Sequence, residues 1–193
     1  MVNMICLSLI LILFYLYQAA TLLPPRFQWK TMDYAWEGAE RESAITDGSY
    51  IAVNNMPTGI ARWKDKLFIT IPRWKKGIPS TLNYVFLNDT QSAPLHPYPN
   101  WEEGCLSPRG TVVSNRTVVS TFRVNVDKCD RLWVVDNGVC DMSMDVKQVS
   151  EPAILVFDLN SDELMQKHVF SDEVLRDTSV LTSVVSIDDY FSI

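Results

Sequence analysis

The chain has 193 residues, of which 47% are hydrophobic and 21% are charged, so its composition is that of a folded globular protein and not of a disordered tail. Its 17 basic and 23 acidic residues give a formal net charge of −6, which argues against general nucleic-acid binding. The charge is uneven, because residues 1–100 carry 9 basic and 7 acidic groups whereas residues 101–193 carry 8 and 16.

The amino terminus has the pattern of a cleaved secretory signal. Ile5 to Tyr17 is an uninterrupted apolar run, and two alanines follow shortly after it. A helix needs about 20 apolar residues to cross a bilayer, so this run is short for a membrane anchor, whereas a short apolar core before small residues is typical of a signal peptide. The sequence therefore predicts a signal peptide over residues 1–20 and a secreted, extracellular chain over residues 21–193, with no membrane association after cleavage. An uncleaved anchor is the alternative.

The rest of the sequence reads as short strands joined by turns. At 67–71 every second residue is Leu or Ile, and at 122–127 apolar and polar side chains alternate, which is the period of a half-buried strand. Further candidate strands are 83–87, 132–136, 154–159 and 181–187. Only 141–146 and 172–176 have helical character, so we expect an all-β protein.

One internal match predicts a structural repeat. Asp65–Ile69 (DKLFI) and Asp130–Val134 (DRLWV) agree in chemical type at all five positions and lie 65 residues apart. Each follows an apolar segment, Gly59–Trp63 and Phe122–Val126 respectively, so each copy reads as a strand-turn-strand unit. A third and weaker copy begins at 184 and runs to 191.

Repeated antiparallel units of this kind suggest the blades of a β-propeller. Residues 21–193 hold fewer than three units of 65 residues, whereas closed propellers have about 4–8 blades. The sequence therefore predicts a partial β-propeller of about two to three blades.

Two triplets match the acceptor pattern for N-linked glycosylation, Asn88-Asp89-Thr90 and Asn115-Arg116-Thr117. A secreted chain would carry these triplets through the compartment in which glycans are added. We therefore expect glycans at Asn88 and Asn115.

The cysteines are odd in number once the signal peptide is removed, because Cys6 is lost and three remain. In an oxidising compartment this leaves an unpaired thiol, an intermolecular bond or a missing partner. We expect Cys105 to pair with Cys129 and Cys140 to be unpaired or to lack its partner. The spacing matches no zinc pattern and only two histidines are present, so no metal site is expected.

Several longer motifs run through the predicted strands. They are Phe27–Lys30 and Asp33–Trp36; then Asn54–Trp63 (NNMPTGIARW), Leu67–Trp74 (LFITIPRW) and Gly77–Asn83 (GIPSTLN); then Phe122–Asp127 with Cys129–Gly138; and finally Pro152–Leu159. Together they resemble the signatures of the Yellow/major royal jelly protein family of insects, and the resemblance covers nearly all of residues 21–193.

The resemblance implies a secreted, often glycosylated, six-bladed β-propeller. Family members are associated with cuticle pigmentation and melanin formation, with dopachrome conversion, and with binding of biogenic amines or larval feeding. It also implies that a full member is roughly twice as long as this sequence and that its ligand pocket lies at the propeller centre, mainly in later blades. The ligand-binding and catalytic residues are therefore left unassigned.

Two runs interleave basic and aromatic residues, Arg62–Lys64 and Arg73–Lys76. Such runs occur in proteins that bind single-stranded nucleic acid. The more economical interpretation is that the tryptophans pack between strands while Lys and Arg point to water or stack on the rings. We expect no nucleic-acid partner.

The acidic residues do not form a recognisable catalytic set. Asp136-Asn137-Gly138 has a carboxylate that could face a pocket, but Asn-Gly favours a hairpin turn. The adjacent pairs at 102–103 and 188–189 point to opposite faces if they lie on strands and read as solvated charge. Asp141 and Asp145 lack the loop pattern of an EF-hand calcium site.

Three hypotheses on function follow. The first is a secreted Yellow-like protein of pigmentation, cuticle or secretion physiology that binds biogenic amines or catechol-derived ligands without a cofactor. The second is an isomerase that converts dopachrome in melanin formation. The third is a truncated product without independent function, because open sheet edges favour aggregation. Nothing in the sequence specifies an oligomer.

Overall fold

The computed structural model describes residues 25–104, 106, 112, 114–171, 173–176 and 179–186. The predicted signal peptide, residues 1–20, lies outside this part. One compact unit holds the described residues up to Trp29 together with Thr90–Ser92, and a second unit holds all other described residues. In the first unit the rings of Phe27 and Trp29 stack with centroids 5.2 Å apart. Every helix and strand below belongs to the second unit.

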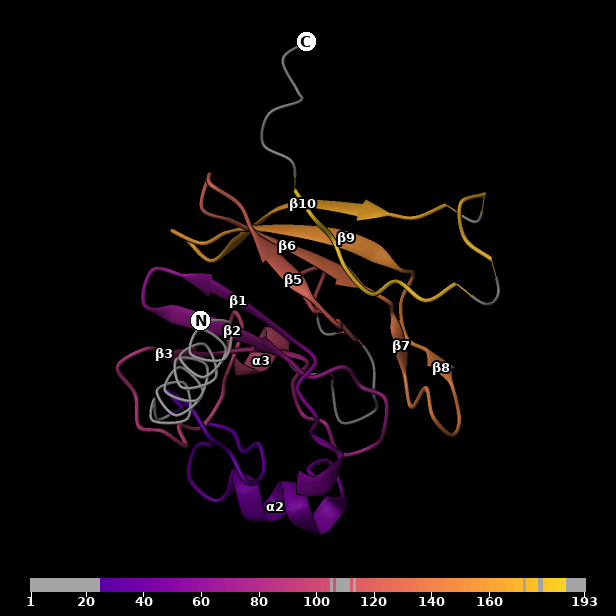
Figure 1. The fold of residues 1–193 in the computed structure, drawn as a ribbon. Coiled ribbons are helices and arrows are strands. Elements are labelled where there is room, and N and C mark those ends of the chain that lie inside the picture. Colours follow the sequence, from indigo (N-terminus) through magenta and orange to yellow (C-terminus); the bar gives the residue numbers. More distant parts are fainter. Residues whose placement is uncertain are drawn as a thin grey trace, which may run out of the picture. The chain divides into compact units, whose positions relative to one another are not determined.

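Two four-stranded antiparallel sheets make up most of the second unit (Figure 1). The first sheet has the order β1-β2-β3-β4, with the bounds Gly59–Trp63, Lys66–Thr70, Leu82–Phe86 and His96–Pro97. The second has the order β5-β6-β9-β10, with the bounds Val124–Val126, Arg131–Asp136, Ala153–Asp158 and Glu163–Val169. The expected all-β character is confirmed for the described residues.

The remaining elements are short. A two-stranded ribbon, β7 (Val139–Cys140) and β8 (Lys147–Gln148), leaves the end of β6. Helix α2 (Glu40–Asp47) and the 3-10 turn η1 (Ala52–Asn54) precede β1, and the single turn of helix α3 (Trp101–Gly104) follows β4. No helix in the described part of the chain has the length and apolar character needed to cross a membrane.

The predicted repeat is confirmed as a repeated strand pair. The segment Asp65–Ile69 makes the turn into β2, and Asp130–Val134 makes the turn into β6, so both copies take the same place in their sheets. In each sheet this second strand pairs antiparallel with the strand before it and with the third strand of the sheet. The third copy lies largely outside the described residues.

Three of the predicted elements are wrong. The described part of the candidate strand at 181–187 pairs with no strand; instead Leu181 and Ser186 are held by the side chains of Asn137 and Asn125. Residues 141–146 form the turn between β7 and β8 and begin with a left-handed Asp141 (φ 55°), and the described part of 172–176 is turn rather than helix.

The two sheets share one hydrophobic core. Phe68 of β2 and Phe157 of β9 are fully buried, and the ring of Tyr98 lies edge-on to both, with centroids 5.2 and 5.5 Å away. The cluster consists of Phe68, Leu82, Tyr98, Val118, Val124, Leu132, Val134, Ala153, Leu155, Phe157 and Leu159. Burial of this apolar area is the main force that joins the sheets.

Polar contacts set the spacing of the sheets at Gly59. The hydroxyls of Thr58 and Thr70 both donate to the carbonyl of Phe122, over 2.8 and 2.6 Å. A Cβ at Gly59 would lie only 2.6 Å from the same carbonyl oxygen. Glycine is therefore required here by the close approach of the chain that enters β5.

A buried carboxylate closes the turn between β5 and β6. Asp127 accepts hydrogen bonds from the amides of Cys129 and Arg131, from Arg131 Nε over 2.6 Å and from the indole of Trp133 over 2.7 Å. Burial raises the pKa of Asp127, but the bonds from Trp133 and Arg131 outweigh it, so its pKa lies below the ordinary value of 3.8.

This lowered pKa predicts an acid-sensitive contribution to stability. It is present above the ordinary pKa of 3.8 and is lost as the pH falls through the lower pKa of the folded state. We expect Asp127→Asn to reduce the free energy of unfolding at pH 7 by about 1–3 kcal/mol and to make it less dependent on pH below 4. Urea unfolding at pH 7 and pH 3 measures both effects. Asp65→Asn, in the exposed turn of the first repeat, is the control, and an equal loss in that variant contradicts the prediction.

Candidate functional site

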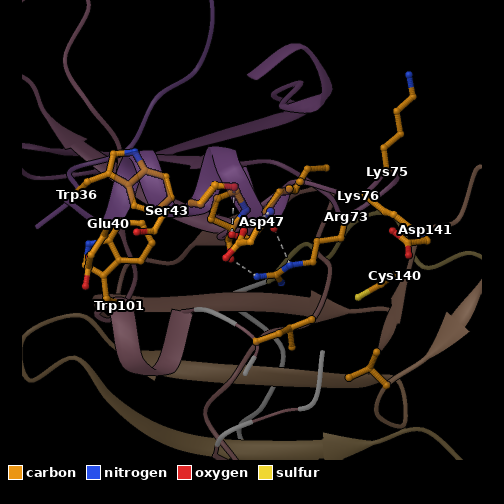
Figure 2. Close-up of a pocket in the computed structure, with 18 of the residues that line it drawn as sticks. Trp36, Glu40, Ser43, Asp47, Arg73, Lys75, Lys76, Trp101, Cys140 and Asp141 are labelled. Atoms are coloured by element: carbon orange, nitrogen blue, oxygen red, sulfur yellow. Dashed lines mark hydrogen bonds between the residues drawn. The ribbon is translucent and has the colours of Figure 1, made fainter. Parts of the chain in front are cut away.

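A cavity of about 1060 Å³ lies between the loops that follow the second strand of each sheet (Figure 2). Its walls come from α2, from the β2–β3 loop at 73–79, from α3 and from the β7–β8 ribbon. Two backbone hydrogen bonds join the loops of the two sheets, from the amide of Asp141 to the carbonyl of Arg73 and from the amide of Ser143 to the carbonyl of Trp74. Repeat-equivalent loops therefore converge on one site.

The side chain of Arg73 lies at the base of the cavity and is buried, with 4% of the residue exposed. Its guanidinium donates to the carbonyls of Ile78, Pro79, Val118 and Val119, and more weakly to that of Gly104. Figure 2 shows dashed hydrogen bonds from the Arg73 guanidinium to residues drawn beside it. A planar fork with five donors suits this task, which the single ammonium of lysine cannot perform.

Asp136, at the end of β6, binds the other side of the same backbone. Its carboxylate is 1% exposed and accepts the amides of Val119, Ser120 and Gly138 over 2.8–2.9 Å. Burial raises the pKa of Asp136, while the three amides and the charge of Arg73 oppose that effect. Residues 118–120 are thus held between the buried guanidinium of Arg73 and the buried carboxyl group of Asp136.

An aromatic wall borders the cavity beside α2. The indoles of Trp36 and Trp101 stack with centroids 4.7 Å apart and an interplanar angle of 29°. Trp36 donates its N–H to Asp33 and Trp101 donates to the carbonyl of Ala35, each over 2.8 Å. The N–H groups are thereby satisfied, and both indoles remain partly exposed where they line the cavity.

The charged lining residues fall into two groups. Glu40 and Asp47 on α2 and Glu102 on α3 line the cavity, and no ion pair to them exists among the described residues. The lining cations lie in the β2–β3 loop and on β8, where Lys147 is 3.9 Å from both Asp141 and Asp145. The lining residues of α2 and α3 thus include three carboxylates and no basic side chain.

The thiol of Cys140 also lines the cavity and is buried. Burial raises its pKa, with Arg73 acting in the opposite direction. A raised pKa leaves this cysteine as a neutral thiol at neutral pH, which is unlike an activated nucleophile.

Comparison with known proteins decides the family. Residues 119–189 match the family model described as Major royal jelly protein. The dopaminechrome tautomerase of Drosophila melanogaster is 33% identical over 161 residues, which cover 82% of this chain and 34% of that relative. Protein yellow of Drosophila subobscura is 34% identical over 154 residues, which cover 78% of this chain and 26% of that relative.

The chain belongs to the Yellow/major royal jelly protein family. It spans about a quarter to a third of the length of these relatives. Most of its signature residues build strands and turns: the first signature covers β1, β2 and the β2–β3 loop, the second covers β5 and β6, and the third covers β9. Within these signatures, Arg73 is a buried residue that lines the cavity, and Asp136 is a buried residue that holds the backbone at 119–120.

The hairpin interpretation of Asp136-Asn137-Gly138 is wrong. Strand β6 pairs with β9 at this point, whereas β7 pairs only with β8, so the three residues link two different sheets. Gly138 has φ 69°, and an added Cβ would meet the carbonyl of Ser150. The carboxylate turns inward because three backbone amides need an acceptor there.

The interpretation of the basic and aromatic runs is confirmed for the first run only. The amine of Lys64 lies 4.1 Å from the ring centroid of Trp63, whose indole donates to Asp130. In the second run Trp74 packs on Phe122, but Arg73 neither points to water nor stacks on a ring.

The adjacent carboxylates take separate roles. Glu103 lies 3.1 Å from Arg116, whereas Glu102 lines the cavity, and the pair at 188–189 lies outside the described residues. Within the described ranges no group of three or more His, Cys, Asp and Glu side chains is placed to hold a metal ion.

The predicted modification sites lie on the surface where the structure describes them. Asn88 and Asn115 are both exposed. Cys129 is an exposed free thiol, and Cys105, its expected partner, lies outside the described residues, so this pairing stays a prediction.

Sequence reasoning missed Trp36, Trp101, Glu40 and Asp47 as lining residues. Helix α2 has no apolar stripe, since Ala44 is its only buried residue, and α3 is a single turn. The one local signal was Gly48, the left-handed residue (φ 78°) that ends α2.

Replacement of Arg73 tests whether its planar fork holds the site together. We expect Arg73→Lys, which keeps the charge, to lower the free energy of unfolding by about 2–4 kcal/mol, since several buried carbonyls lose their donors. Lys75→Gln, in the exposed part of the same loop, should change it by less than about 0.5 kcal/mol. Urea denaturation followed by tryptophan fluorescence measures both, and a stable Arg73→Lys variant would show that the charge alone suffices.

Proposed function

We propose that this chain is part of a secreted protein that binds biogenic amines or catechol-derived ligands in the cavity beside α2. The observation that carries the proposal is the pairing of two partly exposed indoles with three carboxylates that have no cationic partner among the described residues. The same chemistry appears in the name of one relative, dopaminechrome tautomerase, whose substrate derives from a catechol amine.

An aromatic amine matches this wall in two ways. Its ring can pack against Trp36 and Trp101, and its ammonium group can approach Glu40 or Glu102, each of which lines the cavity. An aromatic ring packed against another contributes about 0.5–1.5 kcal/mol beyond its buried area, and carboxylates at the rim add a solvent-screened attraction for the ammonium group. A neutral or anionic ring would gain only the stacking part.

We also propose that the two sheets are successive blades of a β-propeller. Two four-stranded sheets carry the repeat in the same strands and deliver equivalent loops to one cavity, as successive blades of a propeller do. Ligand sites are commonly built from such loops on a rigid scaffold. Secretion is supported by the predicted signal peptide and by the exposure of both acceptor asparagines.

Titration with dopamine tests the binding proposal. We expect saturable quenching of tryptophan fluorescence, and about 3–10-fold weaker binding for Glu40→Gln and for Glu102→Gln, which corresponds to about 0.7–1.4 kcal/mol. Glu42→Gln is the matched control, because Glu42 lies on the same helix but does not line the cavity. Absence of saturation, or an equal loss in Glu42→Gln, would overturn the assignment of the site.

A second candidate is the isomerase, which the name of the dopaminechrome tautomerase relative favours. The isomerisation moves two protons from the saturated ring carbons to the two quinone oxygens, and the electrons of the broken C–H bonds complete the aromatic ring system, so no oxidant or reductant is needed. A carboxylate beside the bound ring, such as Glu40 or Glu102, can act as the base that carries a proton.

Decay of dopaminechrome absorbance separates the isomerase from a binding protein. If the chain is an isomerase, the decay is faster than in buffer and saturates with substrate, and Glu40→Gln or Glu102→Gln slows it by about 10²-fold or more. Glu42→Gln should retain the full rate. Saturable dopamine binding without faster decay removes the isomerase and leaves the binding function.

A further inference from the structure

Strand β10 (Glu163–Val169) is an exposed edge of the second sheet. Only its β9 side is paired among the described strands, and six of its seven residues are exposed. Met165 and Val169 are 54% and 39% exposed. The free side of an edge strand carries backbone donors and acceptors that can pair with a strand of another molecule.

The turn that contains Asn115 runs alongside this strand. Arg116 lies 3.1 Å from Glu163 at the start of β10, and it also donates to the carbonyl of Asp162 over 2.5 Å. Near the other end, the amine of Lys167 donates to the carbonyl of Asn115 over 3.3 Å. Two contacts, four residues apart on β10, therefore fix the position of Asn115 relative to the edge.

The acceptor triplet has one exposed and one buried member. The side chain of Asn115 is exposed, so a glycan fits the folded turn. Thr117 is 1% exposed and its hydroxyl accepts the amide of Ser114 over 3.2 Å. Because the acceptor pattern needs this hydroxyl, modification has to precede folding of the turn, as it does on a chain entering the secretory route.

The residues of β10 protect its free edge only partly against pairing with a strand of another molecule. The strand has a register shift between Leu164 and Gln166, and such irregularities weaken edge pairing. Its one lysine, Lys167, is engaged by the Asn115 carbonyl rather than free to repel another strand. A run of about 20 Å of strand is left with little charge to prevent pairing.

We propose that an N-linked glycan on Asn115 covers the edge of β10 and prevents self-association of the chain through that edge. A bulky, hydrated glycan is suited to this because it excludes another strand without requiring a complementary protein surface. The proposal goes beyond ligand binding, since neither Asn115 nor β10 lines the cavity. It gives the two acceptor sites different roles, because Asn88 lies in the turn after β3.

The test compares secreted full chains made in insect cells, namely wild type, Asn115→Gln and the matched control Asn88→Gln. Peptide mass spectrometry gives the occupancy of each site, and size-exclusion chromatography with light scattering over a dilution series gives self-association. We expect glycan on Asn115, and self-association at least about tenfold stronger in Asn115→Gln than in the other two. An unmodified Asn115, or a variant no more associated than Asn88→Gln, overturns the proposal.

A rescue variant separates an uncovered edge from misfolding. Adding Met165→Lys and Val169→Lys to Asn115→Gln places charge on β10 and should restore the wild-type molecular mass. Continued association of this triple variant contradicts the proposal, because association would then not run through β10. Dopamine titration of all variants should be unchanged, so failure here is distinguishable from failure of the ligand proposal.

Discussion

The loops around the cavity depend on the buried side chains of Arg73 and Asp136, which bind the same backbone segment without forming an ion pair with each other. The guanidinium of Arg73 takes carbonyls on one side of residues 118–120, and the carboxylate of Asp136 takes amides on the other side. A buried charge without partners is costly, so each group forces the surrounding backbone to turn its dipoles inward. The loops of both sheets are thereby fixed to the same short segment. The positions of the cavity walls are fixed as a result.

The same strand-turn-strand unit occurs twice, but its turn residues do different work. In the second copy of the repeat, Asp127 accepts hydrogen bonds from backbone amides of its own turn. Asp130 instead accepts the indole N–H of Trp63 from the first copy over 2.7 Å. At the opposite end of β1, the hydroxyls of Thr58 and Thr70 hold the chain that enters β5. The apolar core is nondirectional and does not by itself fix how the two sheets are aligned. The polar contacts at both ends of β1 fix that alignment.

Period-two alternation predicted β2 and β5, since the pattern is a direct consequence of burying one face of a strand, and the other candidate strands at 83–87, 132–136 and 154–159 are confirmed as β3, β6 and β9. It failed for β10, whose residues are exposed on both faces and so show no alternation. It also gave a false strand at 181–187, where an apolar run is held by asparagine side chains instead of a ladder. The site was beyond this reasoning, because its residues are brought together from 36 to 149 by the fold.

The two carboxylates of α2 that line the cavity do not both favour the helix. Glu40 lies in the first turn, where a carboxylate favours the helix dipole, but Asp47 lies in the last turn, where it opposes the dipole. The last turn carries no basic residue, and the Asp47 carboxylate accepts the amide of Ser49 over 2.9 Å. Glu102 adds a third negative charge to the same cavity. None of these three carboxylates forms an ion pair within the described part of the chain, and a bound ammonium group would supply an opposite charge. The proposed amine site would therefore give this lining the cation that the described residues do not supply.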